Sequence, residues 1–120
     1  MFDVFYYRDK NGNSPIEDYI KSLAAKSDKD SRIRLKKIYE YAKYLSEVGL
    51  RAREPYVSHL DGDIWELRPT NDRVLFAAWD GKSFILLHHF VKKTQKTPPR
   101  EIRQAERNLA DYMERSENDE

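Results

Sequence analysis

The sequence predicts an α+β fold, a small and mostly antiparallel sheet that packs against helices. An aromatic and β-branched segment opens the chain, and two amphipathic stretches follow it. Three further strand-like segments, separated by short turns, then precede a last amphipathic stretch. With this order of elements, the first two helices form a hairpin on one face of the sheet.

Length and composition favour a single cytoplasmic domain. The chain has 120 residues, enough for one domain with one core, which we expect to span residues 1–120. It has no cysteine, so disulfides, thiolate metal sites and thiol nucleophiles are excluded, and the composition fits a reducing cytosol. Asp3 stands where a signal peptide carries basic residues, and no segment approaches the length of a membrane span.

The N-terminal half predicts a strand followed by a capped helix. Residues 2–7 (FDVFYY) indicate the strand, and the turn-forming residues 10–13 end it. Ser14 is a natural N-cap, Pro15 suits the first helical position, and Glu17 completes a capping box. The apolar stripe of this helix consists of Ile16, Tyr19, Ile20 and Leu23.

A second, longer helix is predicted from Asp28 to Val48, with Gly49 as its C-terminal stop. Its other face is basic, but acidic residues are interspersed there, which favours a solvated face over contact with nucleic acid. The apolar stripe of the helix consists of Ile38, Tyr41, Ala42, Leu45 and Val48.

Three strands and a helix complete the prediction after an irregular link that contains Pro55. The strands are Ile64–Arg68, Arg73–Trp79 and Phe84–Lys92, with a turn at residues 69–72 and a two-residue Asp80-Gly81 hairpin turn. The C-terminal helix begins near Thr97-Pro98 and runs to about Tyr112, and residues 113–120 are expected to be frayed. Its apolar stripe is Ile102, Ala105, Leu109 and Tyr112.

The turn at residues 69–72 places two arginines on one face of the sheet. If this turn has four residues, Arg68 and Arg73 are directly opposed and their side chains project from the same face. The opposite face then collects apolar residues of the same two strands and is the expected core face. These residues are Trp65, Leu67, Val74 and Phe76.

A two-residue turn at Asp80-Gly81 predicts the register of the last two strands, because it pairs Trp79 with Lys82 and Arg73 with His88. Three residues, His88, Phe90 and Lys92, then join the arginine face, while His89 points toward the helical core. The same register pairs Ala77 with Phe84 and Leu75 with Leu86. It therefore places Leu75, Phe84 and Leu86 on the arginine face, where we expect the C-terminal helix to cover them and to leave the charged end open.

The segment 90–100 (FVKKTQKTPPR) concentrates positive charge at a strand end. Its lysines are Lys92, Lys93 and Lys96, and Arg100 follows them. Residues 68–107 carry nine Lys/Arg against four Asp/Glu, whereas residues 108–120 carry one against five. Such a cluster fits either a polyanionic partner or a solvated strand exit, and the upstream arginines favour the polyanion.

Single-stranded RNA is a physically sensible ligand for this face, because Phe90 could stack on an unpaired base among cations. Arg68 and Arg73 stay protonated and could clamp phosphate oxygens, whereas His88 or a lysine could exchange protons. No paired-carboxylate motif or His-Glu-x-x-His spacing is present, and neighbouring His88 and His89 point to opposite faces of a strand. We therefore expect neither a metal nor another cofactor.

Several segments together resemble the phage-derived HigB-like toxins of type II toxin-antitoxin systems, within the RelE/ParE superfamily. These segments are WELRP at residues 65–69, RVLF at 73–76, ILLHHFVKK at 85–93 and TQKTPPREI at 94–102. The resemblance spans nearly the whole chain, including the order of elements, and it implies a RelE-like fold.

The resemblance also implies an activity and partners. It implies a cytoplasmic endoribonuclease that cleaves messenger RNA on the translating ribosome and arrests growth. The implied partner is a HigA-like helix-turn-helix antitoxin that neutralises the toxin, so DNA is contacted only through the antitoxin.

Carried over by position, Arg68 and Arg73 match the sheet arginines associated with phosphate stabilisation, and Lys92, Lys93 and Lys96 match the basic strand exit. His88 or Lys93 is the expected proton-transfer group, with Lys93 contributing only if the strand has ended or bulged before it. Phe90 and Arg100 are expected RNA contacts.

Two alternatives stay open at this point. ParE-like relatives share the fold but inhibit DNA gyrase, and fold alone does not separate the two activities. A non-catalytic RNA-binding module would keep the same basic face. Arginines and a proton-transfer group on one face favour RNA cleavage, because gyrase inhibition has no evident need for them.

Overall fold

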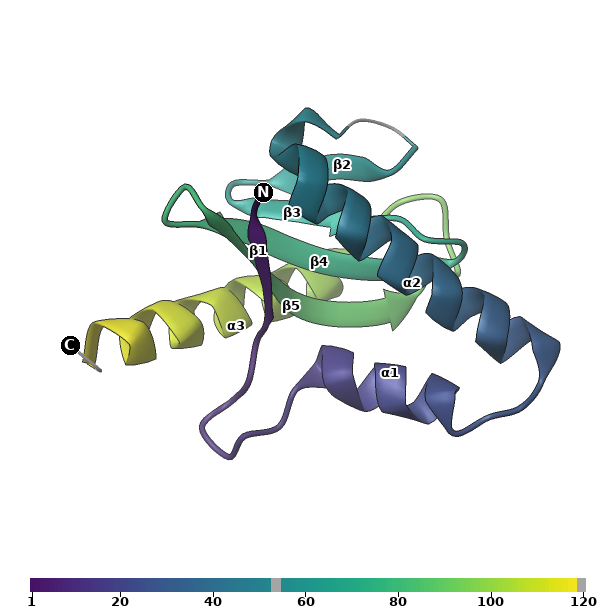
Figure 1. Cartoon of the computed structure of the whole chain (residues 1–120). Coiled ribbons are helices and arrows are strands. Elements are labelled where there is room, and N and C mark those ends of the chain that lie inside the picture. Colours follow the sequence, from purple (N-terminus) through teal and green to yellow (C-terminus); the bar gives the residue numbers. More distant parts are fainter. Residues whose placement is uncertain (53–54, 119–120) are drawn as a thin grey trace.

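The structure is a computed structural model that describes residues 1–52 and 55–118. Its centre is a five-stranded sheet with the strand order β1-β5-β4-β3-β2 (Figure 1). The edge strand β1 runs parallel to β5, and the other neighbouring strands are antiparallel. The strands are β1 (Asp3–Tyr6), β2 (Val57–Asp61), β3 (Ile64–Leu67), β4 (Asp72–Trp79) and β5 (Ser83–Val91).

Helices cover both faces of this sheet (Figure 1). A hairpin of α1 (Pro15–Ala24) and α2 (Lys29–Val48) packs on one face, and α3 (Pro99–Asn118) packs on the other. A short 3₁₀ helix, η1 (Gly49–Arg51), follows α2. This arrangement confirms the predicted α+β class and is compatible with a RelE-like fold.

The first two helices form where the sequence predicts them. Ser14 Oγ accepts a hydrogen bond from the backbone N of Glu17, and Pro15 is the first helical residue. At α2, the Asp28 side chain caps the helix by accepting from the backbone N of Ser31. Gly49 ends α2 with a φ of 64°, a left-handed value that glycine adopts without steric cost.

The predicted irregular link before Ile64 was partly wrong, because it contains strand β2. Val57–Asp61 pairs antiparallel with β3 and forms the edge of the sheet opposite β1. Val57 is buried in the core below α2, which gives this strand an apolar anchor. Pro55 lies in the turn just before the strand, while residues 53 and 54 of the same link lie outside the described part of the chain.

The predicted register of β4 and β5 was wrong at two points. The turn after Trp79 spans three residues, so that Trp79 pairs with Ser83 rather than with Lys82. A bulge then occurs at Leu87, because Phe76 pairs with Leu86 and Leu75 pairs with His88. Each irregularity shifts the register by one residue, so Arg73 pairs with Phe90 rather than with His88.

These two shifts decide which side chains share a face of the sheet. His88 and Phe90 do lie on the face of Arg73, and His89 lies on the face of the helical hairpin, as predicted. Phe84 and Leu86 were assigned to the wrong face, because they belong to the core below α1 and α2. Leu75 and the bulged Leu87 lie beneath α3, together with Ile85.

The C-terminal helix is longer than predicted. It begins at Pro99 and continues to Asn118 instead of ending near Tyr112. Most of the segment expected to be frayed is therefore helical, and residues 119 and 120 lie outside the described part of the chain. Arg115 Nε donates a hydrogen bond to Asp111 one turn earlier, at 3.1 Å, which supports this extension.

None of the helices in residues 1–52 and 55–118 is long and apolar enough to cross a lipid bilayer.

Candidate functional site

The charged end of the α3 face contains a groove of about 430 Å³, here called the Arg68 groove. Its lining comes from β2, β3, the segment between β5 and α3, and α3 itself. Two predicted site residues, Arg68 and Lys96, lie in this groove. The complete lining is Ser58, Leu60, Glu66, Arg68, Gln95, Lys96, Thr97 and Ile102.

Glu66 connects the two predicted arginines. Arg73 Nε lies 2.9 Å from Glu66 Oε1, and Arg68 Nε lies 4.0 Å from the same oxygen. The Thr97 hydroxyl donates a hydrogen bond to Oε2 of Glu66. This carboxylate therefore ties β3 to β4 and to the segment that precedes α3.

Arg68 and Arg73 differ in their access to a ligand. The Arg68 side chain is 26% exposed, whereas the Arg73 side chain is only 6% exposed. Arg73 Nη1 donates to the backbone oxygens of Thr70 and Asp72, at 2.9 and 2.8 Å. Burial lowers the pKa of the Arg73 guanidinium, but an arginine remains protonated. Arg73 thus supplies fixed positive charge beneath the groove, while Arg68 reaches into it.

On the opposite face, the strand that carries Arg73 is anchored by a buried network around Asp72. Tyr19 donates to Oδ1 at 2.7 Å, Arg34 donates to both carboxylate oxygens, and His89 Nε2 lies 3.0 Å from Oδ1. Burial opposes ionisation, but the hydrogen bonds from His89, Arg34 and Tyr19 hold the pKa of the Asp72 carboxyl well below its usual range. The network fixes the start of β4 and therefore the position of Arg73.

Three other predicted residues share a second pocket of about 390 Å³ at the end of β5. Phe90, Lys93 and Arg100 line it, and Glu101 adds a carboxylate. β5 ends at Val91, so the strand has ended before Lys93, as its predicted contribution requires. Lys92 is half-buried, and its backbone N donates to Asn71 at 2.8 Å, which ties the strand exit to the β3–β4 turn.

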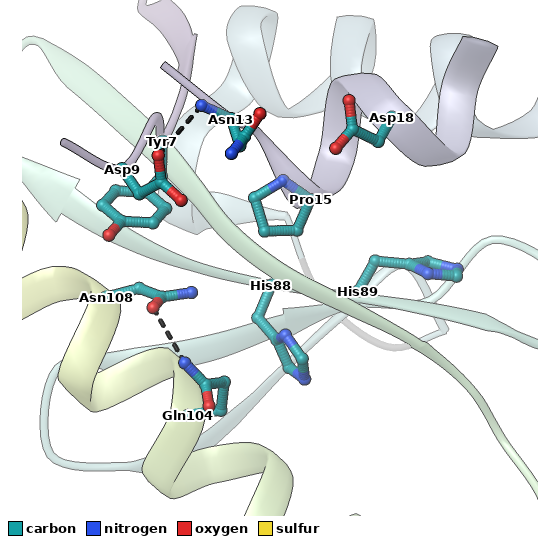
Figure 2. Close-up of a pocket in the computed structure, with 9 residues that line it drawn as sticks. All are labelled: Tyr7, Asp9, Asn13, Pro15, Asp18, His88, His89, Gln104 and Asn108. Carbon is teal, nitrogen blue, oxygen red and sulfur yellow. Dashed lines mark hydrogen bonds between the residues drawn. The ribbon is translucent and has the colours of Figure 1, made fainter. Parts of the chain in front are cut away.

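His88 lines a third pocket, separate from the two described above. This pocket has a volume of about 380 Å³ and lies between α1 and α3, where Tyr7, Gln104 and Asn108 are neighbours (Figure 2). Figure 2 shows His88 pointing toward α3 and His89 pointing away from it. His88 Nε2 lies 3.0 Å from Glu101 Oε1. Because Glu101 also lines the pocket of Lys93 and Arg100, this pair connects the second and third pockets.

Neither of the two carboxylates, Glu66 and Glu101, was predicted from the sequence as a site residue. A signal for Glu66 was present, because alternation along a strand places residues 66 and 68 on the same face. No such signal was available for Glu101, whose contact with His88 joins a strand to a helix thirteen residues later. Among the described residues, no group of three or more histidine, aspartate or glutamate side chains could hold a metal ion.

Fold and groove together define a small α+β protein with a cationic groove at one end of its sheet. A family model for the phage-derived Gp49-like proteins (DUF891) matches residues 18–110, which is more than half of the chain. The chain belongs to this family, which is associated with toxin-antitoxin systems and related to the RelE-type ribonuclease toxins. No curated protein matches the chain.

Proposed function

We propose that this protein is the toxin of a type II toxin-antitoxin system and acts as a metal-independent endoribonuclease on messenger RNA. The observation that carries the proposal is the Arg68 groove, in which Arg68, Lys96 and the Arg73-bound carboxylate of Glu66 meet. Cations at fixed positions suit the charge that develops on a phosphate during cleavage. Membership in the Gp49-like family supports the same activity class.

The reaction needs no cofactor in this proposal. The ribose 2′-hydroxyl loses a proton and attacks the adjacent phosphorus, and the bond to the 5′-oxygen of the next nucleotide breaks as that oxygen gains a proton. Arg68 holds the non-bridging oxygens, and the buried charge of Arg73 stabilises the pentavalent phosphorane. His88 or Lys93 is the proposed proton-transfer group. Because they line the third and second pockets rather than the Arg68 groove, the bound RNA must extend from this groove to one of those pockets.

The path of the RNA follows the remaining cations. Lys92, Lys96 and Arg100 neutralise phosphates on either side of the cleaved bond, and Phe90 stacks on an unpaired base. The substrate in this proposal is mRNA on the translating ribosome. A HigA-like helix-turn-helix antitoxin neutralises the toxin, so DNA is reached only through that partner.

Growth after induction, combined with mapping of RNA 5′ ends, tests the proposal. We expect growth arrest with new mRNA cleavage sites in cells that produce the wild-type chain. The Arg68→Ala variant should stay folded and lose both effects. Arg103→Ala is the matched control, because Arg103 is an exposed arginine of α3 outside the groove lining. Arrest with intact mRNA but unreplicated DNA would contradict the proposal and indicate gyrase inhibition instead.

The proton-transfer group needs a separate comparison. His88→Ala and Lys93→Ala should be expressed, purified and compared in single-turnover cleavage of mRNA on programmed ribosomes across a range of pH. The variant that lacks the proton-transfer group should lose cleavage at all pH values while it still binds the RNA. If both variants cleave at the wild-type rate, neither side chain has this role.

A further inference from the structure

Helix α2 presents a further groove to solvent, distinct from the Arg68 groove and the two pockets described above, and here called the Tyr39 groove. Its volume is about 450 Å³, and its lining comes entirely from α2. Tyr39 is 51% exposed, so its ring is accessible to a partner. The lining residues are Arg32, Leu35, Lys36, Tyr39, Glu40 and Lys43.

The spacing of these residues follows from helical geometry. Arg32, Lys36, Tyr39 and Lys43 are three or four positions apart, so they form one stripe along the helix. Leu35 lies beside this stripe and packs against the core below α2. The floor of the groove is therefore apolar and continuous with the core, and the helix is rigidly supported from beneath.

The rim of the groove is basic. Arg32, Lys36 and Lys43 are exposed and contribute three positive charges, while Glu40 contributes one negative charge. Lys36 Nζ lies 3.9 Å from Glu40, and Lys37 Nζ lies 3.4 Å from it, so this carboxylate is shared with a lysine outside the lining. A surplus of cations around an apolar floor is complementary to a surface with apolar and acidic side chains.

The Tyr39 groove and the Arg68 groove lie on opposite sides of the sheet. α2 and α3 cover opposite faces of the sheet (Figure 1). The core below α2 includes Phe76 and Leu86, whereas the lining of the Arg68 groove includes Ile102 of α3. A molecule bound to α2 would therefore leave Arg68 and Lys96 accessible.

From this arrangement we infer that the Tyr39 groove is the docking surface for an amphipathic, acidic helix of the antitoxin. Its apolar side chains pack on Leu35 and Tyr39, and its carboxylates pair with Arg32, Lys36 and Lys43. The inference rests on the proposed function, since it assigns a surface to the partner named there. An RNA strand on this basic rim is the competing occupant, but the apolar floor offers it few polar groups.

The experiment measures the affinity of the purified chain for the protein encoded by the neighbouring reading frame of the same transcript. Lys36→Glu should weaken this binding by about tenfold or more, because it adds repulsion at the centre of the rim. Lys37→Glu is the matched control, as it reverses the charge of the next residue, which also contacts Glu40 but does not line the groove. Its effect should stay below about threefold.

A second pair of variants tests the apolar floor. Tyr39→Ala should also weaken binding by about tenfold, as expected for an aromatic anchor at an interface. Ile33→Ala is its control, because Ile33 is an exposed apolar residue of the same helix, 44% exposed, that lies outside the lining. All four variants should remain toxic, since none touches the Arg68 groove.

The outcomes separate this inference from the proposed function. Equal binding of the neighbouring protein to all four variants would overturn the docking surface and leave the toxin proposal intact. Loss of binding to a fluorescent single-stranded RNA by Lys36→Glu, with the protein partner still bound, would assign the surface to RNA and also overturn the inference. A neighbouring protein that does not bind the wild-type chain would contradict both proposals.

Discussion

Arg73 Nε lies 2.9 Å from Glu66 Oε1, and both side chains are only 6% exposed. The pair joins β3 to β4 directly below the Arg68 groove, and the hydroxyl of Thr97 adds a third attachment. A buried charge needs a partner in this way, because burial without one is strongly unfavourable. The same contact that stabilises the fold therefore holds the positive charge of the candidate site in place.

Removal of the Glu66 carboxylate should destabilise the protein. Glu66→Ala removes the carboxylate of the salt bridge and leaves the buried Arg73 with only backbone acceptors, which should cost about 3 kcal/mol of the free energy of unfolding. Glu66→Gln should cost less, because an amide oxygen still accepts a hydrogen bond. Urea denaturation at neutral pH measures both values.

The control for this prediction is Glu40→Ala, which removes an exposed carboxylate 3.4 Å from Lys37. An exposed pair of this kind contributes less than about 1 kcal/mol. If the Glu66 and Glu40 variants lost the same stability, the buried pair would not have the role assigned to it.

The cations of the Arg68 groove should determine the salt dependence of RNA binding. Arg68→Ala and Lys96→Ala should each weaken binding of single-stranded RNA and lower the slope of log affinity against log salt by about 0.7. A titration of fluorescent RNA at several salt concentrations gives this slope. Arg103→Ala should leave it unchanged, and an equal decrease in that variant would show that the effect is not specific to the groove.

Stability at acid pH should depend on Asp72. Its folded-state pKa lies below the ordinary value of 3.8 because His89, Arg34 and Tyr19 donate hydrogen bonds to the carboxylate. The ionised group therefore stabilises the fold above that value, and this contribution is lost as the pH falls below it. The wild-type free energy of unfolding should decrease steeply below about pH 4.

Asp72→Asn is the test, because the amide cannot ionise. This variant should be less stable at neutral pH, and its stability should change less between about pH 5 and pH 2 than that of the wild type. Chemical denaturation across this range measures the difference. Parallel curves for the two proteins would refute the role of this carboxylate.

Stability at alkaline pH should depend on Tyr7. Burial, together with the hydrogen bond from its hydroxyl to Asp111 at 2.7 Å, raises the pKa of Tyr7 from 10.0 to about 12. Because the pKa of Tyr7 is higher in the folded protein, the protonated hydroxyl stabilises the fold fully below pH 10. This stabilisation is lost as the pH rises toward 12. Tyr7 directly follows β1, and its hydrogen bond to Asp111 connects this segment to α3. Ionisation of Tyr7 should therefore loosen the contact between the segment after β1 and α3.

Tyr7→Phe should remove this alkaline sensitivity, which thermal unfolding between pH 9 and pH 12 can measure. Tyr56→Phe is the control, since Tyr56 is an exposed tyrosine on the opposite face, where it contacts Tyr41 and Tyr44. A wild-type-like decline in the Tyr7 variant would exclude this hydroxyl as the titrating group.

The helices and the two faces of β3 and β4 could be predicted from the sequence. Ser14 and Asp28 cap their helices through residues only three positions away, and alternation along a strand separates Leu67 from Arg68. Such signals are local, because cap bonds and strand alternation depend on residues within a few positions of one another.

Tertiary structure alone decided the register of β5 and the distribution of the site residues. The bulge at Leu87 buries that side chain beneath α3, and this depends on packing between distant segments rather than on a turn motif. Packing likewise paired His88 with Glu101 and separated it from the Arg68 groove. Local signals therefore specify the helices and the two faces of β3 and β4, whereas long-range burial and ion pairing decide the register of β5 and which cations meet in one groove.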